Sequence, residues 1–116
     1  MQNVKIWHNP RCSKSRNAAA LLAEKGVDAE VVKYLETPPT KEELKEMLNM
    51  LGISARELMR TKEDIYKALN LKEVNDEDQL IDAMVSNPKL IERPIVIKDG
   101  KAVIGRPIEN IIELLG

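Results

Sequence analysis

The sequence predicts an α/β protein whose mixed four-stranded sheet is flanked by helices. The first 35 residues read as strand, helix and strand, the middle carries repeated helix-start signals, and the end reads as a β-hairpin followed by a helix. A strand–helix–strand unit favours parallel strands joined by a right-handed crossover, whereas a hairpin is antiparallel. For a chain of 116 residues we expect one domain, 1–116, with a helical insertion at about 40–90.

The N-terminal strand–helix–strand unit rests on three local signals. The first strand is expected at Val4–Trp7 and ends at the turn-forming residues 8–10. A helix comes next, with Ser13 as its candidate N-cap and Gly26 as its stop. The apolar face of this helix contains Ala18, Leu21 and Leu22. The second strand is expected at 30–35, where apolar and β-branched residues gather.

The predicted insertion is helical and punctuated by caps. The pairs with capping-box spacing, or its Asp variant, are Thr40 with Glu43, Ser54 with Glu57, and Thr61 with Asp64. The apolar stripes at helical spacing are Leu44, Met47, Leu48 and Leu51, and then Leu80, Ile81, Met84 and Val85. Stripes of this kind indicate faces that pack into a core.

The C-terminal part is predicted to be a hairpin and a helix. Two β-rich runs, 94–97 and 102–104, flank Asp99 and Gly100, and Asp-Gly between such runs is a strong hairpin signal. Pro107 then marks the start of the last helix. The sheet therefore receives its third and fourth strands from this hairpin.

The composition excludes several classes of protein. Charged residues make up 32% and apolar residues 43% of the chain, and the net charge is −1, so no general attraction to nucleic acid or anionic membrane is expected. No apolar run approaches the ~20 residues of a membrane span. The N-terminal residues lack the apolar segment of a secretory signal, and we expect a cytoplasmic protein. A single Cys excludes an internal disulfide and a multi-cysteine metal site.

That single Cys lies in a positively charged corner, "HNPRCSKSR", at the predicted junction of strand and helix. The cations of this corner are Arg11, Lys14 and Arg16, and the first carboxylate of the chain is Glu24. Unpaired N–H groups of a first helical turn and cationic neighbours both lower the pKa of a thiol. Cys12 is therefore predicted to be a reactive nucleophile, against the alternative of an inert buried thiol.

The residues around Cys12 separate several kinds of thiol site. A phosphatase-type loop needs an Arg six positions after the Cys, where this chain has Ala18, and a dithiol site needs a second Cys where it has Ser15. Any resolving thiol must therefore come from another molecule. His8 is either an imidazolium or proton-transfer group that assists the thiol, or a strand-end histidine bound to the backbone.

Three further arginines stand beside structural punctuation. Arg60 lies at a predicted helix end, before Thr61, and Arg93 and Arg106 each precede a Pro on either side of the hairpin. A planar guanidinium suits a tetrahedral oxyanion. The alternative for each is an ordinary solvent-exposed position.

Together these residues carry a resemblance to a known family. "HNPRCSKSRN", "YLETPPT", "LGISARELMR" and "ERPIVI…GRP" closely resemble the glutaredoxin-coupled arsenate reductases, the ArsC-like proteins, over essentially the whole chain. The resemblance implies a thioredoxin-like fold and attack of Cys12 on arsenate. It implies that His8 lowers the pKa of the thiol, that Ser15 can hydrogen-bond the thiolate, and that Arg60, Arg93 and Arg106 bind the oxyanion or the arsenylated Cys.

The resemblance also implies the reaction partners. These are arsenate, glutathione as co-substrate and glutaredoxin. We also expect no bound cofactor or metal and a monomeric chain. It places the cis-proline of thioredoxin-like folds at Pro94, so the Arg93–Pro94 peptide bond is expected to be cis. The alternatives are an adaptor like the Spx-like transcription regulators, many of which carry a second Cys at the position of Ser15, and a glutathione-dependent thiol-transferase.

Overall fold

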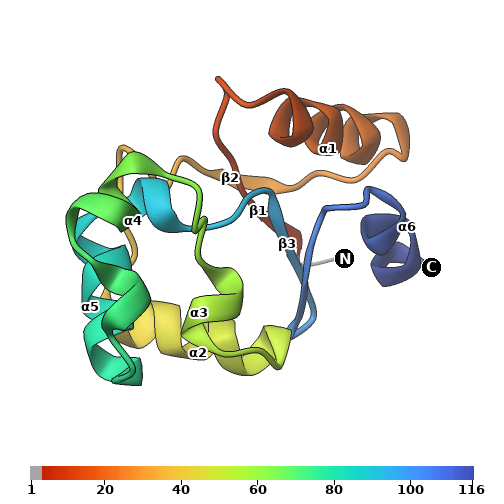
Figure 1. The fold of residues 1–116 in the computed structure, drawn as a ribbon. Helices are drawn as coiled ribbons and strands as arrows, with labels where there is room; N and C mark the ends of the chain where they lie inside the picture. Colours follow the sequence, from red (N-terminus) through yellow and green to blue (C-terminus); the bar gives the residue numbers. More distant parts are fainter. Residues whose placement is uncertain (1–3) are drawn as a thin grey trace. The chain divides into compact units, whose positions relative to one another are not determined.

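A mixed four-stranded sheet forms the centre of the first of two units into which the chain folds (Figure 1). The computed structural model describes residues 4–116. The first unit runs from the N-terminal segment to Thr37 and from Arg93 to Gly116, and the second is Pro38–Glu92. The elements of the first unit are β1 (Val4–Trp7), α1 (Ser13–Glu24), β2 (Glu30–Val32), β3 (Ile95–Lys98), β4 (Lys101–Ile104) and α6 (Glu109–Leu115).

The sheet has the strand order β2-β1-β3-β4 and confirms the predicted α/β class. Strand β1 is parallel to β2 and antiparallel to β3, and β3 is antiparallel to β4. Parallel pairing places the C-terminal ends of β1 and β2 at the same edge, where the His8 N–H donates to the Val32 carbonyl over 2.8 Å. This edge leads directly into the segment with Cys12.

Strand β2 is shorter than predicted. It ends at Val32 because the chain then turns, and the N–H groups of Glu36 and Thr37 donate back to the Lys33 carbonyl over 3.0 and 2.9 Å. The expected strand at 30–35 is therefore wrong over its second half. Local turn hydrogen bonds replace the ladder there.

The predicted hairpin is confirmed. Asp99 (φ 50°) and Gly100 (φ 80°) both adopt left-handed backbone conformations, as the two central residues of a tight hairpin turn require. The last helix begins at Glu109, two residues after Pro107. The Arg93–Pro94 bond is cis as predicted, and Arg106–Pro107 is also cis, which the sequence did not indicate.

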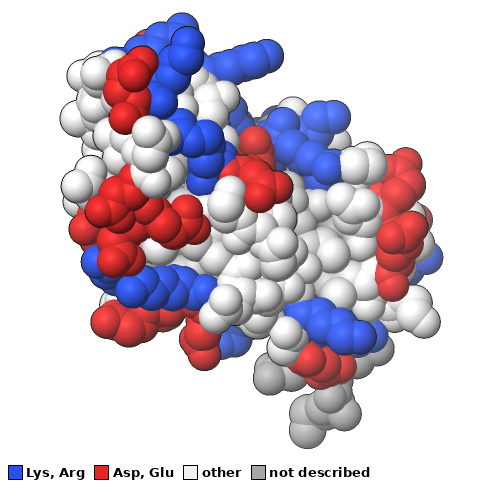
Figure 2. Space-filling model, turned by 60° about the horizontal axis from the view of Figure 1, so that its bottom comes forward, with Lys and Arg blue, Asp and Glu red and all other residues white. Residues whose placement is uncertain are grey.

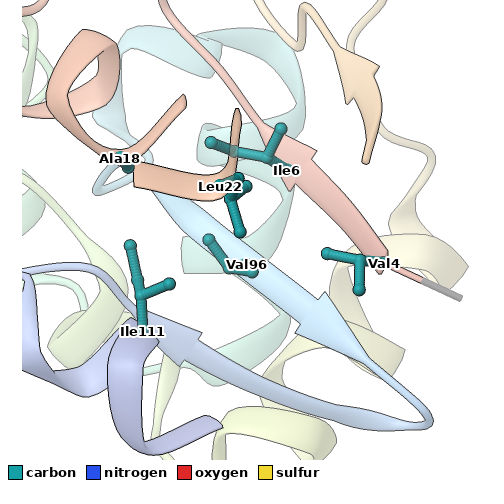
Figure 3. Packing of buried hydrophobic residues seen from close by; sticks show 6 residues of the cluster. All are labelled: Val4, Ile6, Ala18, Leu22, Val96 and Ile111. Atoms are coloured by element: carbon teal, nitrogen blue, oxygen red, sulfur yellow. The ribbon is translucent and has the colours of Figure 1, made fainter. Parts of the chain in front are cut away.

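The core of the first unit lies on one face of the sheet (Figure 3). Its buried residues are Val4 and Ile6 of β1, Ala18 and Leu22 of α1, Val96 of β3 and Ile111 of α6. Ile6 lies directly opposite Val96 in the β1–β3 ladder. Helices α1 and α6 thus pack over the same two central strands, so the start of α1 is held at the C-terminal end of β1.

The second unit contains the helices expected in the insertion. These are α2 (Lys41–Leu51), α3 (Ala55–Leu58), α4 (Asp64–Ala68) and α5 (Glu77–Ser86), with 3-10 turns at Leu71–Glu73 and Pro88–Leu90. The residues of the two predicted stripes that are buried are Leu44, Met47, Leu48, Leu80, Ile81 and Met84. That the whole chain forms one domain stays a prediction.

Two of the three predicted capping boxes are confirmed. Thr40 and Glu43 exchange side-chain and backbone hydrogen bonds at the start of α2, and Ser54 does the same with Glu57 at α3. The third was wrong, because the N-cap of α4 is Glu63 and no side chain caps that helix.

Side chains of both signs lie on the face drawn in Figure 2, in keeping with the net charge of −1. None of the helices within residues 4–116 has the length and apolar character to cross a membrane.

Gly105 follows β4 and packs tightly against the core. Its N–H donates to the Pro94 carbonyl over 2.8 Å, and a Cβ at this position would lie 2.7 Å from Ile111 Cδ1 and 2.9 Å from Pro94 Cγ. Overpacking of this kind costs about 1–3 kcal/mol. We therefore expect Gly105→Ala to lower the free energy of unfolding in urea by about that amount.

A second substitution controls for this prediction. Ile111→Val removes the Cδ1 methyl that the new Cβ would meet. The double variant should therefore be more stable than the sum of the two single losses predicts. Strict additivity of the two losses would contradict the close approach at Gly105.

Candidate active site

Cys12 is the N-cap residue of α1. Its backbone is extended (φ −96°, ψ 124°), its N–H donates to the Asn9 carbonyl, and its carbonyl accepts from the Arg16 N–H, each over 3.0 Å. Ser13 is therefore the first helical residue, and its prediction as N-cap was wrong. An N-cap side chain normally accepts from the second or third N–H of the helix, and here that side chain is a thiol.

The pKa of Cys12 is lowered to about 7 by the groups that face the sulfur. Partial burial raises the pKa, but the backbone N–H of Ser15, a hydrogen bond and the positive charge from the Arg93 side chain, and the backbone N–H of Lys14 outweigh it. Lys14 and Ser15 supply the second and third N–H groups of α1. The predicted direction of the shift in the thiol pKa is confirmed.

Two of the three predicted arginines meet at Cys12. The Arg106 Nη2 donates to Cys12 Sγ over 3.4 Å, and its Nε donates to the Arg93 carbonyl over 2.7 Å. Arg93 precedes β3 and Arg106 follows β4, so the hairpin returns the chain to the same edge of the sheet. Two guanidinium groups from one hairpin thus flank a single sulfur.

His8 and Ser15 meet below the first turn of α1. His8 Nδ1 lies 2.6 Å from Ser15 Oγ, and the Asn9 N–H donates to the same oxygen over 2.9 Å. Ser15 is fully buried. Its hydroxyl therefore joins the end of β1 to the helix start, while its backbone N–H faces the sulfur.

The surroundings of His8 disfavour its protonated form. Burial lowers its pKa below the ordinary 6.5, the charges of Lys33 and Arg16 lower it further, and the hydrogen bond with Ser15 only partly opposes them. The role of His8 toward the thiolate stays a prediction, and the direction of its pKa shift does not favour the imidazolium. Through its hydrogen bond with the Ser15 side chain, His8 helps to position the residue whose backbone N–H faces Cys12.

Arg60 belongs to the second unit. Its Nε donates to Glu63 over 3.1 Å and its Nη1 to Glu92 over 3.0 Å, and its backbone N–H donates to the Leu90 carbonyl over 2.7 Å. The two carboxylates hold the guanidinium in one orientation. Its predicted role toward the oxyanion stays a prediction.

The sequence interpretation missed Asn9. This residue is buried, its Oδ1 accepts from the Arg11 N–H over 3.0 Å, and its carbonyl accepts from Cys12. Asn-Pro ahead of a helix is a signal for such a side-chain-stabilised turn, so the pattern was available. Within residues 4–116, no group of His, Cys, Asp and Glu side chains is arranged to hold a metal ion.

The fold and this site define a thioredoxin-like protein with one activated thiol flanked by two arginines. Comparison with known proteins identifies the family within this class to which the chain belongs. The family model of "ArsC family" matches residues 7–114. The chain belongs to the ArsC family.

Individual relatives agree over nearly the full chain. The chain is 59% identical to the Escherichia coli K12 protein described as "Uncharacterized protein YfgD", covering 99% of this chain and 98% of that protein. It is 56% identical to an arsenate reductase of Neisseria meningitidis, with 99% and 100% coverage. The structure of an arsenate reductase from Vibrio cholerae superimposes with a TM-score of 0.94 at 50% identity, covering 97% of both chains.

The lowered pKa of Cys12 gives a direct prediction. Alkylation of the thiol by iodoacetamide should rise with pH around a midpoint of about 7, because the thiolate is the reacting species. Arg93→Gln should raise this midpoint, since it removes a positive charge that faces the sulfur. His8→Ala should move it less, because Arg93 acts on the sulfur directly whereas His8 contacts it only through Ser15. A wild-type midpoint at or above ~8.5, the value of a free thiol, would contradict the site.

Proposed function

We propose that this protein reduces arsenate to arsenite with Cys12 as the nucleophile. The proposal rests on the surroundings of the Cys12 sulfur. This thiol has a pKa of about 7, lies 3.4 Å from the Arg106 guanidinium and also accepts a hydrogen bond from the Arg93 side chain. A thiolate and guanidinium groups at one point suit a nucleophilic attack on a tetrahedral oxyanion. Relatives named arsenate reductase support the choice of arsenate.

The first step forms a sulfur–arsenic bond. The Cys12 thiolate attacks arsenic, one arsenate oxygen takes up protons and leaves as water, and a covalent arsenylated cysteine remains. Arg93 and Arg106 offset the negative charge that builds up on the arsenate oxygens in the transition state. The first-turn amides of α1 stabilise Cys12 as a thiolate before attack and as a leaving group later.

The electrons come from thiols outside the chain. A glutathione thiolate attacks the Cys12 sulfur, the sulfur–arsenic electron pair leaves with arsenic as arsenite, and Cys12 forms a mixed disulfide with glutathione. Glutaredoxin then reduces this disulfide and restores the thiol. The balance is arsenate plus two thiols to arsenite, one disulfide and water. The chain's single Cys supports external resolution, and this chemistry fits the cytoplasm, where thiols stay reduced.

We further propose that Arg60 contributes to arsenate binding as the third arginine. Its two ion pairs, from Nε to Glu63 and from Nη1 to Glu92, fix the direction of the guanidinium. Support comes from the family pattern around this residue. The Arg60→Lys and Arg56→Lys variants described below separate the contribution of Arg60 to arsenate binding from an effect on protein stability.

The activity is tested by arsenite release from purified protein. Arsenate, glutathione and glutaredoxin should together give continuous turnover, and omission of either thiol component should slow it strongly. Cys12→Ser should abolish turnover, because the hydroxyl is neither ionised at neutral pH nor reducible through a disulfide. Absence of turnover in the wild-type protein would contradict the proposal.

Two outcomes would favour the alternatives. Rapid deglutathionylation of a protein substrate without arsenate reduction would indicate a thiol-transferase. No thiol chemistry of either kind would indicate a binding protein of the adaptor class.

Replacement of the arginines by Lys tests geometry against charge. Lys keeps the charge but loses the planar fork, so Arg93→Lys, Arg106→Lys and Arg60→Lys should each lower kcat/KM for arsenate by about 10- to 150-fold, the range for a charged hydrogen bond. Residual activity near that of wild type in all three variants would overturn the clamp.

Arg56→Lys is the matched control. Arg56 donates to the Tyr66 hydroxyl over 2.6 Å, to the Leu71 carbonyl over 3.3 Å and to the Val74 carbonyl. These bonds lie inside the second unit and involve no reacting group. Arg56→Lys should therefore lower thermal stability while the folded variant keeps its kcat/KM for arsenate.

A further inference from the structure

Four exposed cations surround the segment that carries Cys12 and have no role in the proposed attack on arsenate. They are Arg11, Lys14, Arg16 and Lys33, and we call them the outer cations. Among residues 4–116, the ion pairs are made by other lysines and by Arg60, and none involves an outer cation. A group of like charges without carboxylate partners favours an anionic ligand.

The fold gathers the outer cations at one edge of the sheet. The bond from the His8 N–H to the Val32 carbonyl places Lys33 next to the end of β1. The Arg16 Nη1 donates to the Pro10 carbonyl over 3.0 Å, so its guanidinium is held against the segment before Cys12. The charges of Lys33 and Arg16 both act on His8, which agrees with their place on this edge.

Lys14 and Arg11 extend the same surface. Lys14 is the second residue of α1, so its backbone faces the sulfur while its side chain is exposed. Arg11 precedes Cys12, its N–H is held by Asn9, and its side chain is also exposed. The outer cations thus differ from Arg93 and Arg106, which contact the sulfur or each other.

We propose that the outer cations, led by Arg16 and Lys33, bind the carboxylates of glutathione when its sulfur meets Cys12. The choice of glutathione rests on the proposed function, in which it is the reducing thiol. Glutathione is a tripeptide with a carboxylate on either side of its central cysteine, so its charges flank the reacting sulfur as the outer cations flank Cys12. A small anion that binds only to Arg93 and Arg106 would gain little from positive charges at the end of β2 and in the first turn of α1. The spread of the outer cations therefore suits a larger ligand with two separated carboxylates.

The test uses thiol–disulfide exchange, which does not require arsenate. The Cys12 thiolate attacks oxidised glutathione, the glutathione disulfide bond breaks, and a mixed disulfide and one glutathione thiolate form. The rate is measured by mass spectrometry of the intact protein. The uncharged hydroxyethyl disulfide serves as the reference, because dividing the two rates cancels changes in the pKa and nucleophilicity of Cys12.

Neutral substitutions should lower this rate ratio. Arg16→Gln and Lys33→Gln should each reduce it by about 1.5- to 5-fold, the range for one exposed ion pair. The double variant should reduce it by about 2- to 25-fold if the two charges act independently. The wild-type ratio should also fall with rising ionic strength.

Lys101→Gln is the matched control. Lys101 is exposed in the same unit and pairs with Lys98 at the hairpin turn, and Lys98 lies opposite Val4, the end of β1 away from His8. This variant should keep the wild-type ratio. Retention of the hydroxyethyl disulfide rate shows that each variant is folded with an active thiol. If Arg16→Gln disturbs the local structure by losing the hydrogen bond to Pro10, Lys33→Gln still tests the proposal, because Lys33 lies on an exposed turn.

Three results would overturn the proposal. The first is an unchanged rate ratio in the double variant with an unchanged KM for glutaredoxin. The second is an equal fall of the ratio in Lys101→Gln. The third is an unchanged ratio in the double variant with a raised KM for glutaredoxin, which would assign the outer cations to an acidic protein surface. Failure of the proposed function looks different. In that case, arsenite release is absent while the exchange ratio still depends on Arg16 and Lys33.

Discussion

The site depends on a negative charge placed at the N-cap of a helix. A thiol in a partly buried position would ordinarily stay protonated, because burial opposes the thiolate. At Cys12 the N–H groups of Lys14 and Ser15, together with Arg93, reverse that preference and bring the pKa to about 7. Helix α1 cannot shift or fray at its start without losing this effect. The contacts that Asn9 and Ser15 make beside Cys12 therefore matter because they hold the first turn of α1 next to the sulfur.

Those contacts come from short-range and long-range parts of the fold. Asn9 closes the turn before Cys12 and Ser15 joins that turn to the end of β1. Below them, Ala18 and Leu22 anchor α1 on β1 and β3. From the other end of the chain, Arg106 reaches the sulfur over a separation of 94 residues. Because one core fixes both α1 and the hairpin, the amides and the guanidinium groups keep a common geometry.

The positively charged side chains near Cys12 form two groups that differ in what they contact. Arg93 and Arg106 touch each other or the sulfur and suit the oxyanion. Arg16 and Lys33 are exposed and lower the pKa of His8. This second effect adds to burial, which is the largest cause of the lowered pKa of His8. One set of charges thus acts on the thiol directly, and the other acts on His8, which contacts Ser15.

The sequence by itself determined the features that depend on neighbours in the chain. The Asp99-Gly100 hairpin, two capping boxes and the strand at Val4–Trp7 follow from local backbone preferences. The adjacent amides of Lys14 and Ser15 account for part of the lowered thiol pKa, to which the distant Arg93 adds. The family resemblance added the cis bond at Pro94 and the arginine positions. The structure was needed to show that β2 stops at Val32 and that Cys12, not Ser13, caps α1, because competing local hydrogen bonds decide such boundaries. The tertiary structure alone decided that burial lowers the pKa of His8 and that Arg106 donates to the sulfur. These last two outcomes depend on burial and on contacts between distant segments, and a linear pattern of residue types does not specify which groups lose water or which distant side chains meet.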